Sequence, residues 1–174
     1  MLLGRREGLV KMNYLIDGHN LIAHFPGLSL RMPDDEQALI ELLVRFSQTG
    51  RKKLEVFFDG APAGQAGERS FGRVRAHFVP YTSTADEAIR SALHHLRGAS
   101  RAWVVVSSDR SVQAAAHEAH AQVMRAQDFA DLLQASLLLE AGREAPPDEA
   151  PLSDEEVRQW LELFKPGGKR SKRD

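Results

Sequence analysis

Short apolar runs alternate with longer segments of helical periodicity along most of the chain. The runs, rich in β-branched and aromatic residues, lie at positions 12–16, 53–58, 73–79, 101–106 and 121–124. The segments beside them, at 34–50, 84–98, 111–121 and 128–142, carry apolar residues three and four positions apart, which indicates amphipathic helices. Because runs such as EVFF and WVVV are apolar at consecutive positions, they are typical of parallel strands covered on both faces. The pattern predicts an α/β sandwich with a central, mainly parallel, five-stranded sheet flanked by helices.

Helix-start signals and polar segments divide the chain. Thr84 with Glu87 forms a capping-box pattern at one helix start, and Ser153 with Glu156 forms another. The Gly- and Ala-rich segment 59–72 is expected to be a mobile loop, and the Pro-rich GREAPPDEAP is expected to be a linker. The expected order is an α/β domain over 12–140, a linker over 141–152, an amphipathic helix over 153–164 and a basic disordered tail over 165–174.

Composition narrows the chemistry that the chain can perform. It has 174 residues, of which 43% are hydrophobic, enough for the core of one domain, and it contains no cysteine. This excludes disulfides, thiolate metal sites and a cysteine nucleophile, and it fits a reducing cytoplasm. No apolar run approaches the roughly 18 residues that a membrane span needs, and the charged N-terminus lacks a signal-peptide core. We therefore expect a cytoplasmic protein without a membrane segment.

Charge is distributed unevenly along the chain. The 23 Lys and Arg residues nearly balance the 24 Asp and Glu residues. The last ten residues, however, hold five of the basic side chains and only one acid. A basic tail on an acidic body is typical of an arm that binds a polyanion such as RNA, although such tails also serve solubility.

Acidic residues follow three of the predicted strands. Asp17 comes after the first strand, Asp59 after the second and Asp109 after the fourth, and Asp86 lies in the first turn of the helix that follows the third. Each acid alone has an ordinary structural reading, as a turn residue, a helix cap or a charge near a helix N-terminus. Because the crevice of a parallel α/β sheet lies beyond the carboxyl ends of its strands, all four are expected to converge there.

Converging carboxylates favour a bound cation. Without one, the acids would repel each other and raise one another's pKa. Oxygen ligands suit Mg²⁺ or Mn²⁺, and these ions commonly bind carboxylates together with the phosphate oxygens of a substrate. One such ion can activate water while a second, about 4 Å away, stabilises the leaving oxygen. The acids therefore predict metal-dependent hydrolysis of a phosphodiester.

Four segments carry a resemblance to a known family. YLIDGHNLI, VFFDG, TADEAI and VVVSSDRSVQAAAHEAHAQVMRAQDFADLL resemble, in order and spacing, the NYN branch of the PIN-like nucleases, most closely its bacterial YacP-like group. The resemblance covers residues 12–140. It implies a PIN-like three-layer sandwich whose acids bind Mg²⁺ or Mn²⁺ to cut RNA. Within the YacP-like group it further implies a ribosome-associated endoribonuclease that acts on single-stranded messenger RNA.

The resemblance also assigns roles to individual acids. Asp17 matches the acid after the first strand, Asp86 the acid of the ADE motif and Asp109 the acid of the SD motif. These three are the expected metal ligands. Asp59 matches the acid of the FD motif and is expected to line the catalytic site or to bind through water.

Polar and basic residues complete the predicted site. Asn20 matches the amide of the family's Asp-Gly-x-Asn pattern and is expected to orient Asp17 or a metal-bound water, while Ser108 is expected to hydrogen-bond a ligand or phosphate. His19 stands at a position expected to vary in the family and is assigned no catalytic role. The candidate contacts to RNA phosphates, expected near the crevice, are Arg69, Arg73, Arg75 and Arg110.

Two other functions remain open from the sequence. One is an RNA- or ribosome-binding module whose metal site has lapsed; the presence of all four acids argues against it. The other is a phosphatase of small substrates with Asp17 as the nucleophile. That class of enzyme needs a second aspartate two residues later, where His19 stands.

Overall fold

The computed structural model describes residues 12–144 and 154–163, and its centre is a single six-stranded sheet. The strands are β1 (Asn13–Asp17), β2 (Leu54–Ala61), β3 (Gly67–Phe71), β4 (Val74–Pro80), β5 (Trp103–Val106) and β6 (Gln122–Met124). Their order across the sheet is β3-β4-β2-β1-β5-β6, and every neighbouring pair is parallel except β3 with β4. β1 therefore lies at the centre, and its carboxyl end is next to the carboxyl ends of β2 and β5.

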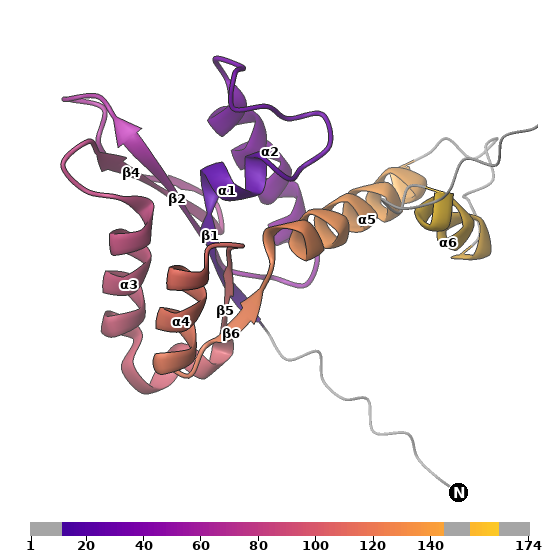
Figure 1. Ribbon diagram of the computed structural model, residues 1–174. Helices are drawn as coiled ribbons and strands as arrows, with labels where there is room; N and C mark the ends of the chain where they lie inside the picture. Colours follow the sequence, from indigo (N-terminus) through magenta and orange to yellow (C-terminus); the bar gives the residue numbers. More distant parts are fainter. Residues whose placement is uncertain (1–11, 145–153, 164–174) are drawn as a thin grey trace, which may run out of the picture. The chain divides into compact units, whose positions relative to one another are not determined.

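Helices cover both faces of the sheet (Figure 1). The helices are α1 (Gly18–Ile22), α2 (Asp35–Gln48), α3 (Ala85–Leu96), α4 (Arg110–Glu118), α5 (Ala126–Glu144) and α6 (Asp154–Leu163), with a 3-10 helix, η1, at Arg97–Ala102. α3 and α4 lie on one face of the sheet, and α1 and α2 lie on the other. This is the three-layer α/β arrangement that the alternating pattern predicted.

The buried side chains form one apolar layer on each face. Beneath α3 and α4, Leu15 and Phe57 of the sheet pack with Ile89 and Val112 of the two helices. The opposite layer contains an aromatic group in which the ring centroids of Tyr14, Phe46 and Phe129 lie 5.2 to 5.9 Å apart. Rings at this spacing contribute about 0.5–1.5 kcal/mol per pair beyond their burial. The central strands are thus fixed from both sides, and they hold the residues at their ends in place.

The prediction of five strands, with residues 59–72 as one loop, was wrong. β2 continues through Ala61, and residues 67–71 form β3, which pairs antiparallel with β4 at the edge of the sheet. Gly72, with φ of +61°, begins the two-residue turn between β3 and β4, as such hairpins require. The side chains of β3 are largely exposed, so the strand has no apolar alternation for a sequence pattern to detect.

The C-terminal part of the chain forms a second compact unit. The boundary between the two units falls between Leu133 and Gln134, within α5. α5 continues to Glu144, four residues into the predicted linker, and α6 at Asp154–Leu163 agrees with the helix expected over 153–164. The remaining linker residues and the basic tail lie outside the described residues. Among the helices described, none combines the length and apolarity needed to cross a membrane.

Candidate functional site

Asp17 ends β1 and begins α1, so the residues after it form a helix rather than an open loop. Its carboxylate Oδ1 accepts the backbone N–H of Asn20 at 3.4 Å. Gly18 makes this sharp junction possible, because a Cβ there would lie 2.3 Å from the Phe58 ring and 2.9 Å from the carbonyl oxygen of Phe57. Only glycine lets α1 start this close to β2, and this junction fixes the position of the Asp17 carboxylate.

Asp109 caps α4 and is connected to Asp17 through a serine. Its Oδ1 accepts the backbone N–H groups of Ser111 at 2.8 Å and Val112 at 3.3 Å. Its own N–H donates to Oγ of Ser107 at 3.1 Å, and that hydroxyl lies 3.5 Å from Oδ2 of Asp17. The two acids, 92 positions apart in the printed sequence, therefore share the buried Ser107 hydroxyl as a neighbour.

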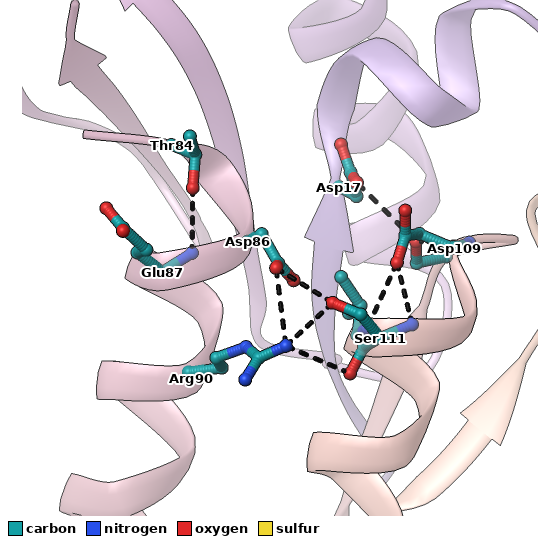
Figure 2. A network of polar contacts seen from close by, with 9 residues as sticks. Asp17, Thr84, Asp86, Glu87, Arg90, Asp109 and Ser111 are labelled. Carbon is teal, nitrogen blue, oxygen red and sulfur yellow. Dashed lines mark hydrogen bonds and ion pairs between the residues drawn. The ribbon is translucent and has the colours of Figure 1, made fainter. Parts of the chain in front are cut away.

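Asp86 is joined to this group through Ser111. The hydroxyl of Ser111 donates to Oδ2 of Asp86 at 2.9 Å, and Nη2 of Arg90 lies 2.6 Å from the same hydroxyl and 3.4 Å from the same Asp86 oxygen. Figure 2 shows Ser111 between Asp86 and Asp109, with Arg90 beside Ser111 and Asp86. The three acids expected to bind metal are thus brought into one network of hydrogen bonds from β1, α3 and α4.

Asp59 lies on the opposite side of Asp17, where His19 holds it. Nδ1 of His19 is 2.9 Å from Oδ1 of Asp59, and Nε2 is 2.9 Å from Oε1 of Glu36. Burial disfavours protonation of His19, but its hydrogen bonds to Asp59 and Glu36 outweigh that cost, so the pKa of the imidazole is raised. His19 thereby links β2, α1 and α2 near Asp17.

The carboxyl group of Asp17 lies in a setting that opposes its ionisation. Burial raises its pKa, and the negative charge of Asp59 raises it further. The hydrogen bond from Asn20, the charge of His19 and the Ser107 hydroxyl act in the other direction but do not cancel the rise. A carboxylate held in this way gains from a nearby cation.

Asn20 and Ser108 fix the turn after β5. Oδ1 of Asn20 accepts the backbone N–H of Ser108 at 2.8 Å. The Ser108 hydroxyl donates to Oε1 of Gln127 at 2.8 Å and accepts the N–H of Ala126 at the start of α5. The Asn20 side chain therefore binds the β5–α4 turn, while its backbone binds Asp17. The predicted roles of Asn20 and Ser108 toward water or phosphate stay predictions.

The four predicted RNA-binding arginines are not together. Arg110 begins α4 directly after Asp109, and Arg69 on β3 lies with its guanidinium 4.6 Å from the centre of the Phe78 ring. Arg73 and Arg75 lie at the amino end of β4, not near the crevice as expected, because β4 begins at Val74 and runs parallel to β2 and so to β1. Their binding to RNA stays a prediction, at a different place.

Several residues of the network were missed from the sequence: Ser107, Ser111, Arg90, Glu36 and the linking role of His19. Ser107 and Ser111 flank Asp109 in the segment SSDRS, where a hydroxyl beside a helix-capping acid was the available signal. Arg90 lies four residues after Asp86, the spacing of an ion pair on one helix face. No sequence signal pairs His19 with Glu36, because their contact depends on the path of the α1–α2 connection.

One oxygen in the network favours a cation. Oδ1 of Asp86 is shielded from water and has no hydrogen-bond partner, whereas such buried oxygens are nearly always paired. The described part of the chain contains no group of three or more His, Asp or Glu side chains already arranged around one metal position. The donor set, all carboxylate and hydroxyl oxygen, is nevertheless the chemistry that Mg²⁺ and Mn²⁺ prefer.

Comparison with known proteins places this fold and site in a class. The α/β sandwich with a mostly parallel sheet is consistent with the PIN-like fold suggested by the sequence, and residues 14–165 match the model of the YacP-like NYN domain. The chain belongs to the YacP-like NYN family. Membership supports a nuclease-type function that concerns RNA. No curated protein sequence matches the chain.

Two solved structures are similar to the chain over most of its length. The crystal structure of a tryptophan-to-leucine mutant of Rae1 (YacP) from Bacillus subtilis has 20% identity and a TM-score of 0.63, covering 86% of this chain and 89% of that one. The crystal structure of Rae1 (YacP) from Bacillus subtilis without that substitution has 21% identity and a TM-score of 0.60, covering 86% and 92%. At this identity the similarity establishes the fold.

Proposed function

We propose that this chain is a metal-dependent endoribonuclease that hydrolyses phosphodiester bonds of RNA at the crevice beside Asp17, Asp86 and Asp109. The observation that carries the proposal is the continuous network through Ser107 and Ser111, which joins these acids from three separate elements. The nuclease-type function of the YacP-like NYN family supports the same conclusion.

Asp17, Asp86 and Asp109 are the residues that would hold Mg²⁺ or Mn²⁺. The unpartnered Oδ1 of Asp86 and the unfavourable ionisation of Asp17 both support a cation there. When bound, such an ion supplies an activated water at neutral pH and stabilises the charge on the leaving oxygen. No covalent intermediate with the chain is required.

The surrounding residues orient the acids and the substrate. The Ser107 and Ser111 hydroxyls restrict rotation of Asp17 and Asp86, since each carboxylate has a hydroxyl beside it. Arg90 places a positive charge beside Asp86, where it can also contact a phosphate oxygen. Asp59, held by His19, lies on β2, the strand next to that of Asp17, and is suited to bind water.

The proposed substrate is single-stranded messenger RNA, and the proposed setting is the ribosome in the cytoplasm. Exposed Arg110 beside Asp109 is suited to contact a phosphate next to the cleaved bond. Co-sedimentation of the full chain with ribosomes, compared with a chain that ends after residue 164, tests this setting. Equal sedimentation of both would exclude the tail as the ribosome contact.

Cleavage of a labelled single-stranded RNA by the purified chain tests the activity. We expect cutting with Mn²⁺ or Mg²⁺ that EDTA abolishes, and a loss of about 10²-fold or more in Asp17→Asn and Asp109→Asn, the size expected when charged groups of a catalytic site are removed. Asp131→Asn, which alters an exposed acid on α5, is the control and should cut normally. Equal cutting by the wild type and both active-site variants would contradict the proposal.

A second candidate is an RNA- or ribosome-binding module with a lapsed metal site. The absence of a ready three-ligand group among the described residues favours it. Calorimetry with Mn²⁺ separates the two functions. Undetectable metal binding together with retained RNA binding would support the binding module, whereas metal binding lost in Asp17→Asn would support the nuclease.

A further inference from the structure

Three basic side chains surround a hollow at the end of the sheet opposite to the carboxylates. Lys53 precedes β2, Arg73 lies in the β3–β4 turn and Arg75 lies on β4, and the space between them has a volume of about 180 Å³. Ser70 and Glu55 also line it. The volume equals that of about six water molecules, enough for a phosphate group with part of its hydration.

The hollow is built on paired strands. The backbone N–H of Leu54 donates to the carbonyl oxygen of Arg73 at 3.1 Å, and Ser70 of β3 pairs with Arg75 of β4. The tight turn at Gly72 holds Arg73 next to these pairs. The basic residues of the hollow are therefore held at fixed backbone positions, which lowers the entropy cost of arranging them around a ligand.

The cations of the hollow have few partners of their own. Within residues 12–144 and 154–163, the side chains of Lys53 and Arg73 make no hydrogen bond or ion pair. Among the described residues, Arg75 has one ion-pair partner, with its Nε 3.9 Å from Oε2 of Glu68, and both side chains are more than half exposed. An exposed pair at that distance contributes little, so Arg75 is free to bind another anion.

The acid inside the hollow already has a hydrogen-bond partner. Oε2 of Glu55 lies 2.9 Å from Nε2 of His77, and the ring of His77 stacks on Phe57. The hydrogen bond to His77 lowers the pKa of Glu55, and the positive charges of Arg75 and Lys53 lower it further. The positive charges of Arg75 and Lys53 therefore act on the carboxylate inside the hollow. Glu55 is hydrogen-bonded to His77 and Glu68 is only loosely paired with Arg75, so these two acids do not offset three basic groups.

We infer that the hollow of Lys53, Ser70, Arg73 and Arg75 binds a phosphate group of RNA, at a site separate from the catalytic carboxylates. The inference rests on the proposed function only in taking RNA as the ligand. Asp17 pairs with Phe57, four residues after Lys53 on β2, so the two sites are about 13 Å apart along the strand. One extended RNA strand can span this distance and occupy both sites, and the hollow then contributes affinity without taking part in the chemistry.

Binding of fluorescent single-stranded RNA, measured by anisotropy over a series of salt concentrations in EDTA, tests the inference. We expect Arg73→Gln and Lys53→Gln each to weaken binding about 2- to 5-fold, the range for an exposed ion pair. They should do so equally for different RNA sequences and lower the slope of log affinity against log salt by about 0.7 per lost contact. Arg101→Gln is the matched control, because it removes one exposed charge at the same end of the sheet but outside the hollow.

The outcomes separate this inference from the proposed activity. Unchanged affinity and salt slope in both variants, or equal weakening by Arg101→Gln, would overturn the phosphate site even if the wild type cuts RNA. Weakened binding in the two variants supports the site even if no cutting is found. Inorganic phosphate is titrated in parallel by calorimetry. Loss of phosphate binding with unchanged RNA binding would mean that the hollow binds free phosphate instead, which also overturns the inference.

Discussion

Nδ1 of His19 lies 2.9 Å from Oδ1 of Asp59, and the other nitrogen of the same ring lies 2.9 Å from Glu36. His19 therefore connects two carboxylates from different elements, α2 and β2, next to Asp17. The sequence assigned it no catalytic role, and its position supports a role in holding Asp59. This arrangement leads to a prediction about stability and pH.

Replacement of His19 is expected to remove a pH-dependent part of the stability. The folded state raises the pKa of His19 above its ordinary value of 6.5. The contribution of the protonated imidazole to the free energy of unfolding is therefore fully present below pH 6.5 and is lost as the pH rises through the raised pKa. His19→Gln should therefore lower the free energy of unfolding by about 1–2 kcal/mol at mildly acidic pH and by less at alkaline pH. Urea unfolding at several pH values measures this. The exposed His117→Gln serves as the control, and a difference from the wild type that grows with pH would contradict the prediction.

Asp17→Asn is expected to stabilise the protein while it stops cleavage. Burial and the charge of Asp59 raise the pKa of Asp17, so ionisation of Asp17 opposes folding at every pH above the ordinary value of 3.8, most fully above the raised value. Asparagine caps a helix as well as aspartate does. We expect a gain of about 0.5–2 kcal/mol near neutral pH, the usual size for relief of a functional strain, which disappears below pH 3.8.

Unfolding of Asp17→Asn must be measured in EDTA, because a metal bound to the wild type would stabilise it and hide the effect. Asp131→Asn on α5 controls for the loss of one negative charge. If Asp17→Asn is less stable than the wild type at neutral pH, the acid is not in the unfavourable setting that its surroundings indicate.

Ser111→Ala should separate Asp86 from Asp109. The hydroxyl donates to Asp86 and accepts from Arg90, while the backbone of the same residue donates to Asp109. Its loss leaves Asp86 with only the longer contact to Arg90, at 3.4 Å, and we expect cleavage to fall about 10- to 100-fold, as when a hydrogen bond that orients a metal ligand is removed. Stability should change by only about 1 kcal/mol.

The matched control for Ser111→Ala is Ser83→Ala. Ser83 also donates to a carboxylate near the start of α3, at 2.7 Å from Oε2 of Glu87, but it is not part of the network. Single-turnover cleavage rates compare the two variants. Equal rates would show that the link between Asp86 and Asp109 has no effect on the reaction.

Much of the fold could be predicted from the sequence, because its buried strands appear there as runs of consecutive apolar residues. All four residues of β5 are buried, and the capping pattern at Thr84 appears as its Oγ1 accepting the N–H of Glu87 at 3.1 Å. β3 was missed for the converse reason, since an exposed edge strand is specified by its pairing with β4 and not by its own pattern. Local sequence patterns thus predicted the elements that have apolar faces. They failed for an exposed strand, which forms only through its pairing with a neighbouring strand.

The convergence of Asp17, Asp86 and Asp109 was predictable because strand ends in a parallel sheet lie at a common edge. Their connections were not predictable, since Ser111 reaches Asp86 across the space between α4 and α3, and such distances are fixed only by helix packing. Arg73 was misplaced because it begins the strand predicted over 73–79, and the amino end of a parallel strand lies at the edge of the sheet opposite to the acids. Residue types were therefore easier to predict than their partners.

Gly18→Ala tests whether the junction after Asp17 is as tight as its geometry indicates. A Cβ at Gly18 would lie 2.3 and 2.5 Å from two atoms of the Phe58 ring and 2.9 Å from the carbonyl oxygen of Phe57. Since Phe58 is fully buried and the carbonyl belongs to β2, neither can move away freely. We expect the free energy of unfolding to fall by about 1–3 kcal/mol, the usual cost of overpacking. Cleavage per folded molecule should fall as well, because α1 and the Asp17 carboxylate must shift.

Gly142→Ala is the control for this substitution. Gly142 lies in α5, and a Cβ there would meet no atom within 4 Å, so alanine should leave stability unchanged or raise it by up to about 1 kcal/mol. Thermal unfolding and cleavage of both variants are compared with the wild type. If Gly18→Ala were as stable and as active as Gly142→Ala, close packing of α1 on β2 would not be what positions Asp17, and the contacts from Asn20 and Ser107 would have to do so.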